Sequence, residues 1–138
     1  MQAVKAGVDT VEHGSMLTTE GARLMKERGT FLVPTISAIR SMVDHPDEVP
    51  TYAVEKAAAL AGEARDAFRR ALRSGVLVAC GTDAGTPFNP HGNAPFEIVR
   101  MVEWGMTPVR AMRAATSPAP ITMAGFMTAS ICSMGFAS

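Results

Sequence analysis

Two short runs of apolar, β-prone residues constrain the fold of this chain more than any other feature. They occupy residues 30–36 and 76–80, and neither contains a charged residue. Runs of this kind are typical of strands that are buried on both faces of a parallel sheet. Pro34 is expected at the end of the first strand, where no ladder hydrogen bond needs its missing N–H. A long amphipathic segment separates the two runs, and such alternation of strand and helix predicts a parallel α/β fold.

The long segment, residues 51–74, is the clearest predicted helix. Its apolar residues recur at helical spacing, and Gly75 follows as a stop signal. The stripe that we expect to be buried consists of Ala57, Leu60, Ala61, Ala64, Phe68, Ala71 and Leu72.

Shorter elements are predicted on both sides of this helix from capping residues and helix breakers. Thr18 or Thr19 is the expected N-cap of one of them, because threonine hydroxyls accept hydrogen bonds from free helical N–H groups. The predicted elements are a helix ending at Gly7, a strand at 10–14, a helix from 20 to Gly29, a loop at 37–50 that leads into the long helix, and helices at 95–104 and 107–115.

Composition and charge indicate a globular protein and argue against a nucleic-acid partner. The chain has 138 residues and zero net charge, from 13 Lys and Arg against 13 Asp and Glu, which fits one globular domain and not a disordered chain. The largest basic group, Arg69-Arg70-Arg73, is expected to be a solvated helix face, so we predict no nucleic-acid partner. Two cysteines and no secretory signal in residues 1–20 favour a cytoplasmic location.

The end of the chain differs from the rest, because residues 117–138 contain no charged residue. A segment of this length could just cross a bilayer, for which about 20 apolar residues are needed. However, Pro118, Pro120, Gly125 and Gly135 interrupt it. We therefore expect no membrane partner, although a C-terminal anchor stays as a minor alternative. A shifted reading frame would produce the same change in composition.

Residues that could carry chemistry follow the predicted strands. His13 comes after the first strand and Asp83 after the third. Because the carboxyl ends of parallel strands meet at one rim of a sheet, we expect a metal or acid–base site there. His91, in the loop after Asp83, could reach a substrate at the same rim. Each residue also has a purely structural alternative. His13 could be a hydrogen-bonded histidine at a strand end, Asp83 could form a turn, and His91 could be an ordinary loop residue.

Two stretches resemble a known family when they are taken together. Residues 6–14, AGVDTVEHG, are similar to the sixth-strand motif of the amidohydrolase superfamily. Residues 81–84, GTDA, with His91-Gly92 and residues 105–116, resemble its eighth strand and last barrel helices. Residues 31–35 between them correspond to the seventh strand. The likeness is to the imidazolonepropionase-like and prolidase-like branch, and it extends to about residue 117.

This resemblance implies a (β/α)8 TIM barrel with one or two divalent metal ions, Zn²⁺ being expected, at its C-terminal rim. It implies hydrolysis of C–N bonds in small amide or dipeptide substrates. By the same resemblance His13 is a metal ligand, and Asp83 is both a metal ligand and the catalytic group that takes the proton of the attacking water. His91 is a substrate-binding residue, and the full-length enzyme is a homo-oligomer.

Other parts of the family pattern are absent from this chain. The His-x-His pair of the first strand, the Lys of the fourth and the His of the fifth are missing, and a full barrel needs about 250 residues. We therefore expect residues 1–117 to be the last three βα units, strands six to eight, followed by an aberrant tail at 118–138. Such a chain would be inactive alone. The alternative is a non-catalytic α/β binding module derived from such an enzyme.

Overall fold

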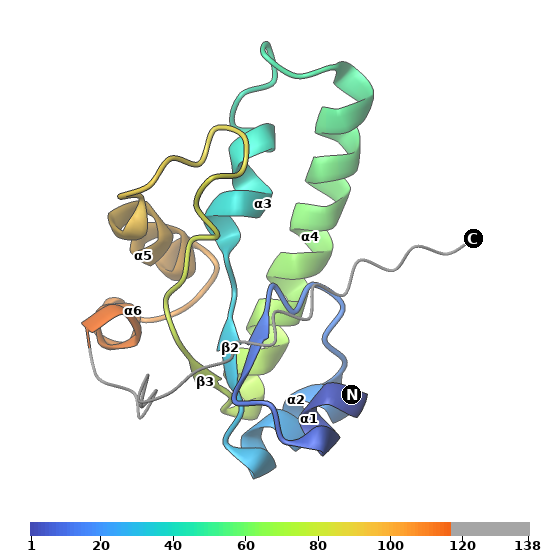
Figure 1. Cartoon of the computed structure of the whole chain (residues 1–138), viewed down its shortest axis with the longest axis vertical. Helices are drawn as coiled ribbons and strands as arrows, with labels where there is room; N and C mark the ends of the chain where they lie inside the picture. Colours follow the sequence, from blue (N-terminus) through green and yellow to red (C-terminus); the bar gives the residue numbers. More distant parts are fainter. Residues whose placement is uncertain (117–138) are drawn as a thin grey trace.

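The computed structural model describes residues 1–116, which form a small parallel sheet surrounded by helices (Figure 1). The predicted tail at 118–138 and Cys132 lie outside the described residues. The elements, in chain order, are α1 (Gln2–Ala6), β1 (Thr10–Glu12), α2 (Thr19–Arg28), β2 (Phe31–Val33), α3 (Ile36–Val43), α4 (Thr51–Ser74), β3 (Leu77–Val78), α5 (Ala94–Glu103) and α6 (Pro108–Thr116).

The strands pair in parallel in the order β1-β2-β3, which confirms the predicted parallel α/β fold. Glu12 lies opposite Val33, and Leu32 lies opposite Val78, so the three strands end at the same rim of the sheet. β2 is the central strand of the described sheet, and β1 and β3 are its edges.

The side chains of β2 are buried on both faces of the sheet, as predicted. Leu32 is 1 % exposed and belongs to the main core, which the helices share. Phe31 and Val33 point to the other face and form a smaller cluster with Ala79, because successive strand residues alternate between faces. The prediction of full burial for residues 76–80 was wrong in part. Leu77 lies on an edge strand and is 49 % exposed.

The longest helix, α4, has the predicted bounds and ends at Gly75 in a left-handed conformation (φ 78°). It packs against both α2 and α3, and Figure 1 shows it running along most of the length of the molecule. Most of the predicted stripe is buried, but Leu60 is 42 % exposed and Leu72 only half-buried. No helix within residues 1–116 combines the length and the apolar character that crossing a bilayer requires.

The caps predicted for α2 are present. The hydroxyl of Thr18 accepts a hydrogen bond from the N–H of Gly21 at the start of α2 (3.1 Å), and Gly29 ends that helix in a left-handed conformation. The basic group on α4 is not only solvated. The Arg69 guanidinium donates to the carbonyl of Trp104, and Arg70 donates to the carbonyl of Leu17.

The predicted loop at 37–50 was wrong over its first half, where the chain forms α3. The residue before this helix, Thr35, is left-handed (φ 48°), and its side chain does not cap the helix. Instead, the carboxylate of Glu97 on α5 accepts hydrogen bonds from the first N–H groups of α3. The stabilising group lies about 60 positions away in the chain, so local patterns could not reveal this helix.

Candidate functional site

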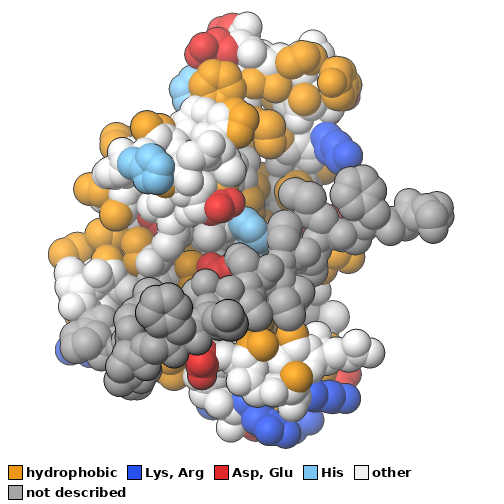
Figure 2. All heavy atoms as spheres, viewed as in Figure 1, with side chains coloured by type: hydrophobic (Ala, Val, Ile, Leu, Met, Phe, Trp, Pro, Cys, Tyr) orange, Lys and Arg blue, Asp and Glu red, His pale blue; other side chains and the backbone are white. Residues whose placement is uncertain are grey.

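The rim where the three strands end holds three residues in an unusual backbone conformation. His13, Thr35 and Asp83 follow β1, β2 and β3, and their φ angles are 61°, 48° and 52°. Residues other than glycine rarely adopt positive φ, and such strain is concentrated at functional sites. In Figure 2, histidine and acidic side chains gather in the middle of the visible face, above the strand ends. The candidate functional site therefore lies at this rim.

The ring of His13 is held by the side chain of Thr35. The Nδ1 atom lies 2.5 Å from the Thr35 hydroxyl oxygen. That hydroxyl donates its own hydrogen to the carbonyl of Pro34 (2.8 Å), so its oxygen accepts from an N–H at Nδ1. In the neutral ring, Nε2 is then left without a hydrogen. A histidine in this state offers a free electron pair at Nε2, which is the form that binds metals.

The free nitrogen of His13 faces the carboxylate of Asp83. The distance from Nε2 to Oδ2 is 3.9 Å, which is too long for a hydrogen bond. The side chains are 28 % and 46 % exposed, so both can be reached from solvent. An imidazole nitrogen and a carboxylate oxygen that face each other without bonding are suited to share a cation, and both are zinc ligands in proteins.

The loop that carries Asp83 is organised by a buried asparagine. The Asn89 side chain is 1 % exposed, and its amide donates to the carbonyls of Thr82 (2.7 Å) and Asp83 (3.0 Å). The carbonyl of Asn89 in turn accepts from the N–H of Gly85 (2.9 Å). Sequence analysis missed Asn89, because a loop asparagine next to a proline is common in any turn.

Two glycines of the motifs pack closely against side chains of β2 at the rim. A Cβ at Gly14 would lie 2.6 Å from Leu32 Cδ1, and its φ is 61°. A Cβ at Gly81 would lie 2.5 Å from Val33 Cγ1. Both contacts are with side chains of β2, so a side chain at either position would require Leu32 or Val33 to shift.

The predicted third residue, His91, is exposed, and within residues 1–116 no hydrogen bond or ion pair joins it to His13 or Asp83. None of its polar atoms has a hydrogen-bond or ion-pair partner within residues 1–116. A different histidine, His45, stacks on Phe88 with 4.6 Å between ring centroids, which joins the α3–α4 loop to the loop after Asp83. In the described part of the chain, no three His, Cys, Asp or Glu side chains converge as a complete metal site would require.

Glu97 was also missed by the sequence analysis, although it is buried completely (0 % exposed). Its Oε1 accepts from the N–H of Ile36 (2.8 Å), and its Oε2 accepts from the N–H of Ser37 (2.7 Å). Burial raises the pKa of this carboxyl above its ordinary value, and these hydrogen bonds and the charge of Arg100 offset only part of that rise. An acidic residue in the first turn of a helix is ordinarily explained by the helix dipole, so no pattern in the sequence distinguishes Glu97 from other such residues.

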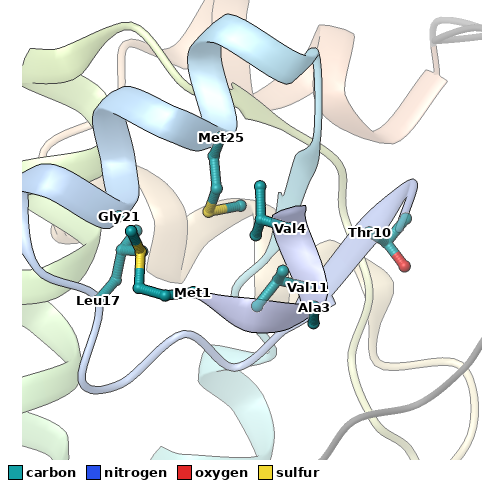
Figure 3. Close-up of a pocket in the computed structure, with 8 residues that line it drawn as sticks. All are labelled: Met1, Ala3, Val4, Thr10, Val11, Leu17, Gly21 and Met25. Atoms are coloured by element: carbon teal, nitrogen blue, oxygen red, sulfur yellow. The ribbon is translucent and has the colours of Figure 1, made fainter. Parts of the chain in front are cut away.

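A small cavity lies away from this site, between α1, β1 and α2 (Figure 3). Its volume is about 130 Å³, and its walls are mostly apolar side chains such as Val4, Leu17 and Met25. It reaches Thr10 at the start of β1, whereas His13 follows the end of that strand. Ligand pockets have about 300–1,000 Å³, so this cavity is a packing gap.

Cys80, which follows β3, is half-buried as a small apolar side chain. Burial raises the pKa of its thiol to about 11, and the negative charge of Glu97 adds to the shift. Because only the thiolate is nucleophilic, we expect Cys80 in a Cys132→Ser variant to react with iodoacetamide at pH 8 about 100-fold more slowly than in the urea-unfolded chain. The rate should rise about tenfold per pH unit until pH 11. Equal rates in the folded and unfolded chains would contradict this pKa.

Comparison with known proteins shows the family of this chain. The sequence model of the amidohydrolase family matches residues 1–124. The ochratoxinase of Aspergillus niger is 36% identical over 125 residues, which are 89% of this chain and 25% of that protein. Its crystal structure superposes with a TM-score of 0.71 at 37% identity, covering 86% of this chain and 26% of that one.

A second solved structure, a Xaa-Pro dipeptidase with bound methionine in its active site, is similar to the same extent. It is 42% identical with a TM-score of 0.71, and the match covers 83% of this chain and 29% of the dipeptidase. The chain thus spans between a quarter and a third of the length of these relatives. The family match extends over most of the sequence. The chain therefore belongs to the amidohydrolase family.

Proposed function

We propose that residues 1–116 are the last three βα units, strands six to eight, of a (β/α)8 barrel that hydrolyses C–N bonds with the help of a divalent metal. His13 and Asp83 are two of its metal ligands. The observation that carries the proposal is the free Nε2 of His13 facing the Asp83 carboxylate at 3.9 Å. We take Zn²⁺ as the metal, because one imidazole nitrogen and one carboxylate oxygen suit it.

The residues of this chain have distinct parts in the reaction. Zn²⁺, when bound, supplies the positive charge that makes water a nucleophile at neutral pH. The Asp83 carboxylate takes a proton from the attacking water and returns it to the amine nitrogen that leaves. Thr35 keeps the proton of His13 on Nδ1, so that Nε2 stays available. His91 contacts the substrate from the loop that follows Asp83.

The proposed substrates are small amides and dipeptides. This class is supported by the likeness to a Xaa-Pro dipeptidase and to an ochratoxinase. A zinc site takes at least three protein ligands, and His13 and Asp83 are two, so residues 1–116 alone should be inactive. A cytoplasmic location and a homo-oligomeric full-length enzyme belong to the same proposal.

A second candidate function is a non-catalytic module that binds a partner strand. The observation that favours it is that β1 and β3 each pair with only one strand within residues 1–116, since edge strands present unpaired backbone groups. The two candidate functions differ in whether they depend on the side chains of His13 and Asp83. A strand-binding module would tolerate their loss, and a metal site would not.

Zinc binding provides the direct test. In a Cys132→Ser background, we expect the chain to bind one Zn²⁺ in isothermal titration calorimetry, weakly because two ligands are present. His13→Ala should weaken binding at least tenfold, about 1.4 kcal/mol or more, because it removes the nitrogen ligand. The control is His45→Ala, which removes a half-buried histidine that stacks on Phe88. Equal losses in the two variants would contradict the assigned site.

A further inference from the structure

We propose that Glu97 is a positioning residue that frees the Thr35 hydroxyl to hold His13 in its Nδ1–H tautomer. This inference rests on the proposed role of His13 as a metal ligand. In this role, a network of contacts joins α5 to the rim through the start of α3. The network consists of the Glu97 carboxylate, the N–H groups of Ile36 and Ser37, the Thr35 hydroxyl and the ring of His13.

Thr35 stands at the N-cap of α3 but does not act as a threonine normally does there. A threonine at the N-cap turns its hydroxyl toward the helix and accepts a hydrogen bond from the second or third N–H. Thr18 does this at the start of α2, where its hydroxyl accepts from Gly21. Thr35 has the same position before α3 and does not do it. Its hydroxyl is directed instead to the carbonyl of Pro34 and to His13.

The carboxylate of Glu97 replaces the missing threonine cap of α3. Glu97 accepts from Ser37, whose N–H is the second of the helix and a usual partner of a capping hydroxyl, and from Ile36 before it. With both N–H groups satisfied by a buried carboxylate, Thr35 can adopt its left-handed backbone and leave its hydroxyl at the rim. A local cap by Thr35 would take that hydroxyl away from His13.

A purely structural role for Glu97 must be separated from this one. α3 and α5 are also tied at the other end of α3, where Asp44 accepts from Arg40 (2.6 Å) and from Arg100 (2.7 Å). Asp44→Asn therefore weakens the packing of the same two helices without touching Thr35. It is the matched control for Glu97→Gln, which keeps the size of the side chain but places an amide NH₂ against an N–H donor.

The test reads the tautomer of His13 directly. We would record ring ¹⁵N spectra of histidine-labelled chain by magic-angle-spinning NMR of sedimented protein, and assign His13 with a His13→Gln variant. The unchanged chain should show a protonated Nδ1 and an unprotonated Nε2. Glu97→Gln should shift the tautomer ratio at least fivefold toward Nε2–H, as should Thr35→Val, which removes the acceptor. Asp44→Asn should leave the ratio unchanged. Glu97→Asp, too short to reach both N–H groups, is the second variant if Glu97→Gln does not fold.

Zn²⁺ added to the same samples separates this inference from the proposed function. A tautomer shift in Glu97→Gln, with Zn²⁺ moving no His13 signal in the unchanged chain, would support the positioning role and refute the ligand role. An unchanged tautomer in Glu97→Gln, with Zn²⁺ shifting His13 as before, would overturn the positioning role alone. Equal shifts in Glu97→Gln and Asp44→Asn would also overturn it, because helix packing would then explain both.

Discussion

Asp83→Asn is expected to reduce hydrolysis by about 1,000-fold or more in a barrel that contains residues 1–116 of this chain. Asparagine keeps the shape of the side chain but cannot take a proton from water, and proton transfer of this kind contributes about 10²–10⁴-fold. The assay needs a complete barrel. We would replace the matching segment of the Xaa-Pro dipeptidase, which is 42% identical, with residues 1–116. The quantity to measure is kcat/KM for a Xaa-Pro dipeptide with divalent metal present.

The chimera has two controls. Asp66→Asn changes an exposed aspartate on α4 in the same way and should leave kcat/KM within about twofold. Residues 1–116 alone should show no hydrolysis. A folded, active chimera in which Asp83→Asn keeps more than a tenth of the activity would refute the role of Asp83. A folded chimera without activity would refute the wider proposal that these residues complete such a barrel.

Phe68→Ala should lower the free energy of unfolding by about 3–5 kcal/mol, the largest stability effect that we expect of a single substitution. The Phe68 side chain, in the C-terminal half of α4, is 2 % exposed. Its ring meets Trp104 edge-on, with 6.2 Å between centroids, so it also joins α4 to the end of α5. Truncation removes both the burial and the aromatic contact. Urea unfolding followed by circular dichroism would measure the change.

Leu60→Ala is the matched control for that prediction. Leu60 lies on the same helix and in the same predicted apolar stripe, but it is 42 % exposed. Its truncation should therefore lower the free energy of unfolding by less than about 1 kcal/mol. If Leu60→Ala and Phe68→Ala destabilised the chain equally, the packing of α4 described above would be wrong.

Much of the fold could be predicted because its signals are local. The apolar run before Pro34 predicted a strand buried on both faces, and it is the central strand β2. Thr18, Gly29 and Gly75 marked helix ends through chemistry within one turn of the chain. The juxtaposition of His13 and Asp83 also followed from a general rule, because carboxyl ends of parallel strands meet at one rim.

The remainder could not be predicted, because its causes are distant in sequence. α3 depends on Glu97, and neither residue 36 nor residue 97 has a neighbour in sequence that indicates the contact. Asn89 stabilises the Asp83 loop through backbone carbonyls, which no side-chain pattern encodes. The exposure of Leu77 depends on its place at a sheet edge, since an apolar run gives no strand order. The roles of His13, Asp83 and His91 stay predictions.

The cap of α3 by Glu97 has a consequence for the order in which the chain folds. Ile36 and Glu97 are 61 positions apart, so a long loop must close before their hydrogen bond forms. The chain therefore loses conformational entropy before this contact contributes any stabilisation. Helices such as α2 and α4, closed by local caps, need no such step. The rim around His13 should therefore be completed late in folding. By the same argument, a local opening that separates α5 from α3 would disorganise the rim while the rest of the chain stays folded.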